Sequence, residues 1–257
     1  MPNSGRLLST KAYMFCIMYI YKLFLINPWV IQIFTEVVLS TLFILIFSLG
    51  LSILMTVHYL RKKAKSLFFW SAGMWGFAVS AALELAFAAD LYNEMLIKSY
   101  LFAVAALVAL LAMGSVELTN NNRVKIAYGF YNISTVVILL LSLAETSIGN
   151  ILSGGVVYGS LPVLVIVGSS LVTFPATVIL FAMSLISYRK TRQARFLNIT
   201  AGIIVVSIAG TLYIANFPSI LYIAEFIDIF LIWLGFVDLR TIFHHAEAGS
   251  EHVHGGV

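Results

Sequence analysis

The chain has 257 residues, of which 61% are hydrophobic and only 10% are charged, and its formal net charge is +4. A soluble domain averages about 45–50% apolar and about 25% charged residues, so this composition predicts a protein that buries its apolar surface in lipid. Seven spans of about 20 residues each would leave only short loops, which excludes a separate soluble catalytic domain. We find no phosphate-binding loop, nucleophile elbow or HExxH motif, and we therefore expect a protein that is not an enzyme.

Apolar runs separated by short polar loops predict an all-α, polytopic membrane bundle of seven transmembrane helices. In chain order the predicted spans are Val30 to Tyr59, Leu67 to Ala88, Leu96 to Val116, Ile126 to Ala144, Leu161 to Tyr188, Phe196 to Ala215 and Ser219 to Val237. These spans form one transmembrane domain, residues 30–238. Residues 239–257 form a His- and Gly-rich tail, which we expect to be solvated in the cytoplasm, although such a tract could also bind metal weakly.

Residues 1–29 admit two interpretations. The stretch from Ala12 to Trp29 is apolar apart from Lys22, so it could be an eighth span or an amphipathic helix at the membrane surface. Asn27-Pro28 would end a helix just before the first long span, which suits both interpretations. We favour the interfacial helix.

The basic residues predict the orientation. All but one of the Lys and Arg residues between or after the spans fall in alternate loops, and cytoplasmic loops are the ones enriched in these residues. The residues on the predicted cytoplasmic side are Arg61, Lys62, Lys63, Lys65, Arg123, Lys125, Arg189, Lys190, Arg192, Arg195 and Arg240, and the exception is Lys98. We therefore expect a multi-pass protein of the cell membrane with its N-terminus outside and its C-terminus in the cytoplasm. The bases lie beside spans, which suits anionic lipid head groups rather than nucleic acid.

Carboxyl groups within the predicted spans are the most informative feature. Glu84 lies about 17 residues, or about 25 Å, beyond the start of its span, and Glu225 and Asp228 lie about 9 and 13 Å into the last span. Their spacing of three places Glu225 and Asp228 on one helix face. Because charges at membrane depth are costly, these three residues are a candidate ion path, proton relay or binding site. Shallower acids near span ends are Glu36, Asp90, Glu94 and Glu145.

The fifth predicted span contains Ser169, Ser170, Thr173 and Pro175. Pro175 removes a backbone hydrogen bond and should kink the helix, while nearby hydroxyls can satisfy the freed carbonyls. The segment is either a hinge facing the acids or a kink that serves packing, and the packing kink is the plainer interpretation.

The sequence predicts no cofactor and no metal within the spans. Seven spans with an aspartate deep in the last one resemble the plan of microbial rhodopsins, in which a lysine four residues after the aspartate carries retinal. Here that position is Ile232, and the last span has no lysine, so the likeness is one of shape. His58 is the only histidine in a predicted span, which excludes bis-histidine haem ligation.

A second resemblance covers the segment from Phe69-Trp70 through Trp75 to Glu84-Leu85. It is similar to the second span of the seven-helix sensor regions found ahead of prokaryotic histidine kinases. That resemblance implies a signalling role through a partner, because no kinase domain follows Arg240.

Three hypotheses for the function follow. The favoured one is an accessory or assembly subunit of a larger membrane complex, which explains the short loops and the lack of catalytic motifs. The second is a receptor-like sensor that signals through a cytoplasmic partner. The third is a proton, cation or small-solute transporter that uses the buried carboxyls.

Overall fold

The computed structural model describes residues 28–236 except 90, 120, 150, 154–155, 158, 160, 193–196 and 206–217. Nearly all of the N-terminal segment, residues 1–29, and the whole tail therefore lie outside the described residues. The interpretations of both segments stay predictions.

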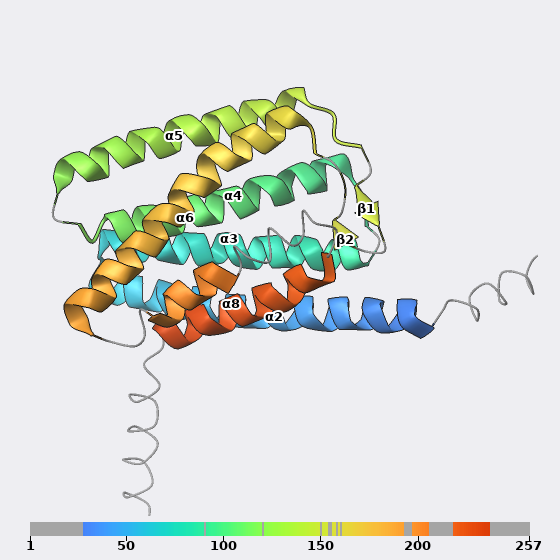
Figure 1. Ribbon diagram of the computed structural model, residues 1–257, viewed down its shortest axis with the longest axis horizontal. Coiled ribbons are helices and arrows are strands. Elements are labelled where there is room, and N and C mark those ends of the chain that lie inside the picture. The colour runs from blue at the N-terminus through green and yellow to red at the C-terminus, as the bar shows by residue number, and fades with distance from the viewer. Residues whose placement is uncertain are drawn as a thin grey trace, which may run out of the picture.

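Six long helices and one short hairpin make up the described fold (Figure 1). The helices are α2 (Pro28–Lys62), α3 (Lys65–Ala88), α4 (Glu94–Val116), α5 (Asn122–Glu145), α6 (Val163–Thr191) and α8 (Pro218–Phe236), and residues 197–205 are also helical. The predicted helical class is thus confirmed. The exception is an antiparallel ladder of two residue pairs between β1 (Leu152–Ser153) and β2 (Val156–Val157). Gly154-Gly155 between β-forming residues is a hairpin signal that hydropathy alone does not detect.

Five of these helices are long and apolar enough to cross a membrane. They are Val38–Lys62, Lys65–Ala88, Glu94–Val116, Asn122–Glu145 and Val163–Lys190. They coincide with the first five predicted spans, so the chain has the helices of an integral membrane protein. The sixth predicted span is described only at residues 197–205, and the seventh coincides with α8.

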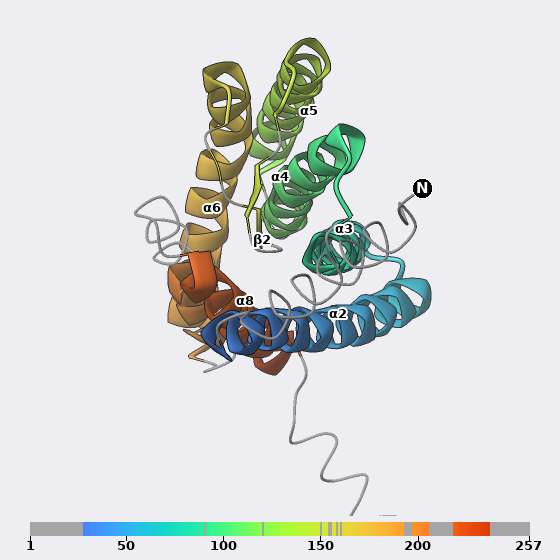
Figure 2. The same cartoon turned by 90° about the vertical axis from the view of Figure 1, so that its right-hand side faces the viewer.

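Consecutive helices pack side by side, and α8 returns to the first of them. The sequential pairs α2–α3, α3–α4, α4–α5 and α5–α6 are in contact, and α4 also packs on α6 while α8 packs on α2. Viewed end-on, α2, α3 and α4 form an arc that α6 and α8 continue (Figure 2). An apolar core joins α2, α3, α4 and α8 through Leu51, Met74, Leu111 and Ile229.

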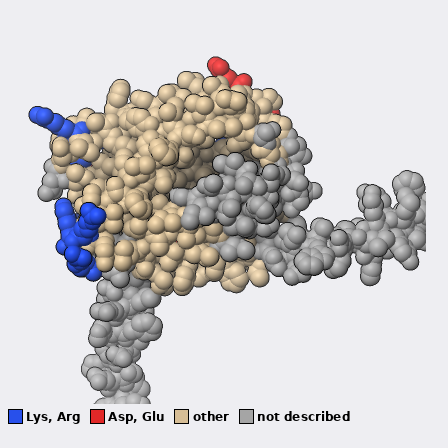
Figure 3. Space-filling model, in the orientation of Figure 1, with Lys and Arg blue, Asp and Glu red and all other residues tan. Residues whose placement is uncertain are grey.

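Most of the described basic side chains gather at one end of the bundle. The described basic residues at one end, here called the basic end, are Arg61, Lys62, Lys63, Lys65, Arg123, Lys125, Arg189, Lys190 and Arg192, and Figure 3 shows them gathered on one side. Glu117 also lies at the basic end, where it pairs with Lys125 at 3.3 Å. The opposite end, here called the acidic end, carries Glu94, Lys98 and Glu145. The gathering of the bases at one end is the pattern from which we predict the orientation.

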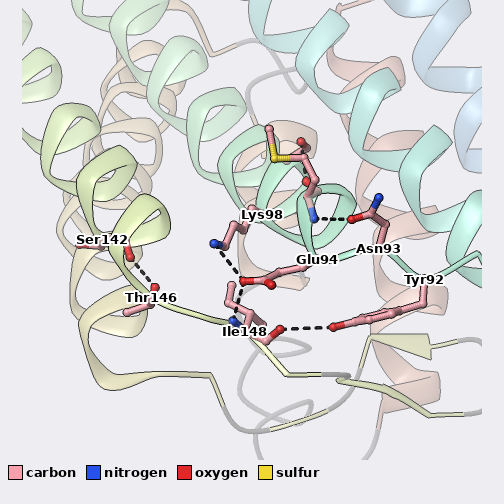
Figure 4. A network of polar contacts seen from close by, with 9 residues as sticks. Tyr92, Asn93, Glu94, Lys98, Ser142, Thr146 and Ile148 are labelled. Atoms are coloured by element: carbon pink, nitrogen blue, oxygen red, sulfur yellow. Dashed lines mark hydrogen bonds and ion pairs between the residues drawn. The ribbon is translucent and has the colours of Figure 1, made fainter.

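A polar network fastens the loop after α5 to the start of α4 at the acidic end (Figure 4). Glu94 Oε1 accepts hydrogen bonds from Lys98 Nζ at 3.0 Å and from the Ile148 backbone N–H at 3.1 Å. Tyr92 donates its hydroxyl to the Ile148 carbonyl at 3.3 Å. Asn93 caps α4 by accepting from the Met95 N–H at 2.9 Å. The loop leading to β1 is therefore held against α4.

Candidate functional site

Glu84 projects from α3 into the interior of the bundle near the acidic end. It lies four residues before the end of α3, and its residue is only 5% exposed. Its Oε1 accepts a hydrogen bond of 2.7 Å from the hydroxyl of Tyr100 on α4. The Tyr100 ring packs edge-on against Phe87, with ring centroids 5.7 Å apart, so the hydroxyl is held in place. Among the described residues, Glu84 Oε2 has no hydrogen-bond partner.

Glu225 and Asp228 approach Glu84 from α8. The carboxyl of Glu225 interacts with those of both Glu84 and Asp228, so it links the other two acids. Asp228 is 5% exposed, and its Oδ1 is buried without a hydrogen-bond partner in the part of the chain that the structure describes. The helical segment 197–205 passes beside this oxygen at Gly202, where an added Cβ would collide with Oδ1. A glycine at this position therefore makes room for the carboxyl.

These acids lack a compensating positive charge within the described residues. Lys98 is the described base at the acidic end, and it pairs with Glu94 instead. No three His, Cys, Asp or Glu side chains of the described chain stand close enough together to hold a metal ion. This cluster of carboxyls is here called the acid site (Glu84, Glu225 and Asp228).

A cavity of about 330 Å³ opens toward the basic end, between α2, α3, α4, α6, residues 197–205 and α8. Its polar lining consists of Lys62, Trp70, Ser115, Ser184 and Ser187, and the rest is mostly aliphatic. We call it the inner cavity.

The inner cavity ends one helical turn from the acid site. Ile232 lines the cavity and lies four residues after Asp228, which is about 6 Å along α8 at 1.5 Å per residue. Ile203, next to Gly202, lines it as well. Residues four apart share a helix face, so the cavity and the Asp228 carboxyl lie on the same side of α8.

Trp70 is fixed in the cavity wall by close packing and hydrogen bonds. Its indole Nε1 donates to the Leu111 carbonyl at 3.2 Å and to Ser115 Oγ at 3.4 Å. The ring lies against Gly114, where an added Cβ would collide with it. On the other wall, the Thr200 hydroxyl donates to Ser184 Oγ at 2.9 Å. The wall is therefore preformed.

The predicted hinge residues fall within α6, which continues through Pro175. The carbonyl that Pro175 leaves without a partner is that of Leu171, and it accepts a hydrogen bond of 2.7 Å from the Tyr131 hydroxyl of α5. Thr173 bonds back to the Ser169 carbonyl at 3.0 Å, and Ser169 to the Ile166 carbonyl at 3.2 Å. These contacts attach the segment to α5 and to its own helix, which favours the packing interpretation over the hinge.

Of the four shallow acids, the two whose side chains are described do not belong to the acid site. Glu94 belongs to the polar network at the start of α4, and Glu145 is exposed at the end of α5. The side chain of Glu36 and all of Asp90 lie outside the described residues. The prediction for these two acids is therefore untested.

Sequence reasoning missed Tyr100 and the inner cavity, and it interprets Gly202 only as a small residue that lets helices pack closely, not as a neighbour of Asp228. Tyr100 had a detectable signal. Two antiparallel helices joined by a short turn place residues equally far from the turn at the same depth, and Glu84 and Tyr100 are equally far from residue 92. The position of Gly202 beside Asp228 and the lining of the cavity depend on how helices far apart in the sequence are rotated against each other. Sequence periodicity does not specify that rotation.

Comparison with known proteins adds no relative. No protein-family model, no curated protein and no solved structure matches the chain. The fold and site thus define the class by themselves: an α-helical integral membrane protein with an acid site inside its bundle.

Proposed function

We propose that this protein is a non-enzymatic, multi-pass transporter of the cell membrane that binds and releases protons at Glu84, Glu225 and Asp228. The observation that carries the proposal is the convergence of these carboxyls. They come from helices far apart in the sequence and meet in the bundle interior, and two of them keep a buried oxygen without a described hydrogen-bond partner.

The physical cost of this arrangement supports a functional role. Burying an unpaired carboxyl is expensive, and apolar residues at the same positions would avoid the cost. Natural proteins break such packing rules mainly at functional sites. Neighbouring carboxyls repel each other when both are charged and form a hydrogen bond when one is protonated, so the pair of Glu84 and Glu225 suits reversible proton binding.

The inner cavity supports a route to the acid site from the basic end. In this proposal α8 is the seventh span, the basic end faces the cytoplasm, and protons reach Asp228 past Ile232. The polar network around Glu94 closes the acidic end. The hypotheses of an accessory subunit and of a receptor-like sensor give the buried carboxyls no task, whereas a proton-binding transporter uses them.

Proton binding is tested by infrared difference spectroscopy of the purified protein in nanodiscs across a pH titration. We expect carboxyl bands that change in Glu84→Gln and in Asp228→Asn. Glu145→Gln is the matched control, since it removes the same group from an exposed position at the end of α5. Spectra in which Glu84→Gln and Asp228→Asn match the wild type throughout the titration would refute the proton site.

Orientation is tested separately in intact cells. Cysteines introduced at Lys63 and Arg192, both at the basic end, should resist an impermeant maleimide and react once the cells are permeabilised. Labelling of both positions in intact cells would place the basic end outside and reverse the proposed direction of the route.

A further inference from the structure

We infer that the inner cavity is a binding site for a small organic anion with a compact apolar body. The claim that this site holds the substrate of a transporter rests on the proposed function. The claim that it binds an anion depends only on the cavity. The inference follows from the volume of the cavity, the nature of its walls and the position of its charge.

The size and walls of the cavity define the body of the ligand. Its volume of about 330 Å³ lies at the lower end of the range of about 300–1,000 Å³ that small-molecule sites occupy. Most of the lining is aliphatic and comes from α4, α6, residues 197–205 and α8, as with Leu111, Leu180 and Ile203. The flat indole of Trp70 forms part of the wall. A single ring or a short branched chain fits such a space, and a large polar molecule does not.

The charge of the cavity defines the head group. Lys62 is the one charged residue in the described lining, and it makes no ion pair within the described part of the chain. Leu67, another lining residue, belongs to the first turn of α3, which has no side-chain cap. The N–H groups of that turn are thus directed toward the basic end, and helix N-termini favour anions. The last turns of α2, α4 and α8 also reach the cavity at Lys62, Ser115 and Gly235, so partial charges of both signs surround it. The full charge of Lys62 therefore decides the preference, which is for a carboxylate or sulfonate over an organic cation.

The hydroxyls of the wall supply the remaining polarity. Ser184 and Ser187 lie one turn apart on α6 and face Ser115 of α4 across the same cavity. Ser115 already donates to the Leu111 carbonyl at 3.1 Å, and Ser184 accepts from Thr200 at 2.9 Å, so each oxygen keeps a lone pair that can accept from a ligand hydroxyl. Such a wall, mostly apolar with a few convergent polar groups, is typical of sites that bind small molecules.

The location of the cavity connects the anion with the acid site. A ligand in the inner cavity would lie one helical turn from Asp228, on the same face of α8. A proton on the acid site and an anion in the cavity together carry no net charge, so moving both at once avoids the cost of moving charge through the membrane. We therefore expect the anion and the proton to be transported together.

The test uses benzenesulfonate, which has one ring and a permanent negative charge and does not cross lipid unaided. Binding to the protein in nanodiscs is measured by isothermal titration calorimetry. Lys62 is exposed, so we expect Lys62→Gln to weaken binding by about threefold to fivefold, the effect of losing an exposed ion pair, and Lys62→Arg to restore it. Arg61→Gln removes a neighbouring charge outside the cavity lining and should bind as the wild type does. Benzyltrimethylammonium, a cation of similar size, should not bind.

Two results would overturn the inference: no benzenesulfonate binding to the wild type, or equal binding to Lys62→Gln. The latter would mean that the ligand binds elsewhere, for example in the apolar groove between α3, α4 and α5. Glu84→Gln separates the inference from the proposed function. It should bind benzenesulfonate normally but fail to take up protons into liposomes when a benzenesulfonate gradient is imposed. If the wild type binds the anion but no carboxyl titrates, the proposed function fails and the binding site stands.

Discussion

Removing the Tyr100 hydroxyl is the sharpest test of the geometry of the acid site. Tyr100→Phe keeps the ring that packs on Phe87 and deletes the donor that lies 2.7 Å from Glu84 Oε1. The variant would leave Glu84 with the Glu225 carboxyl as the neighbour that still interacts with it, and a second carboxyl replaces the lost donor only when one of the two is protonated. A buried polar group that loses its partner costs about 1–3 kcal/mol, and we expect the free energy of unfolding to fall by that amount.

A double-mutant cycle shows whether this loss comes from the hydrogen bond. Glu84→Met replaces the acceptor with an apolar side chain of similar length, and in that background Tyr100→Phe should cost about 0–0.5 kcal/mol, because removing both partners is nearly neutral. The coupling energy should therefore be about 1–3 kcal/mol.

The assay is equilibrium unfolding with sodium dodecyl sulfate in mixed micelles, followed by far-ultraviolet circular dichroism. Tyr59→Phe is the control, since the Tyr59 hydroxyl makes no hydrogen bond within the described residues, and it should change stability by less than about 0.5 kcal/mol. An equal effect of Tyr100→Phe in the wild-type and Glu84→Met backgrounds would refute the described contact between α3 and α4.

Two further predictions concern packing and the acidic end. Gly114→Ala should destabilise the protein by about 1–3 kcal/mol, because the added Cβ collides with the Trp70 indole. Gly50→Ala is the control: its Cβ meets nothing within 4 Å, so it should be neutral or stabilise the protein by up to about 1 kcal/mol. Thermal unfolding of both variants measures the difference. Glu94→Ala should speed amide hydrogen exchange at Ile148, because the Ile148 N–H loses its acceptor. The exchange is measured by mass spectrometry, and an unchanged rate would mean that other contacts hold the loop.

The sequence predicts the first five spans well because long apolar runs can hide their backbone polar groups from lipid only as helices. The predicted ends differ from the described ones where polar residues begin a helix. The predicted fourth span starts at Ile126, but α5 starts at Asn122, because the side chain of Asn121 accepts from the Arg123 N–H at 3.0 Å and caps the first turn. Hydropathy does not register such a turn, since its residues are polar.

The acid site was predictable in part. Depth along a span follows from residue number, so the sequence places Glu84, Glu225 and Asp228 inside the membrane and predicts that the last two share a face. Their meeting depends on α8 packing beside α2 and α3, which is a property of helix order in space. The sequence has no way to specify that order without a known relative. The pairing of Lys98 with Glu94 did have a signal, because an acid four residues before a base on a helix lies on the same face.

The packing of α8 places the acid site and the inner cavity one helical turn apart. One face of α8 carries aromatic rings that pack edge-on against Phe47 of α2: Phe226, Phe230 and Trp233, with ring centroids 6.2, 6.4 and 6.5 Å from that of Phe47. Asp228 and Ile232 project from a different face, toward residues 197–205. The rings therefore attach one face of α8 to α2, while the Asp228 carboxyl on another face meets Gly202, where no side chain competes for the space.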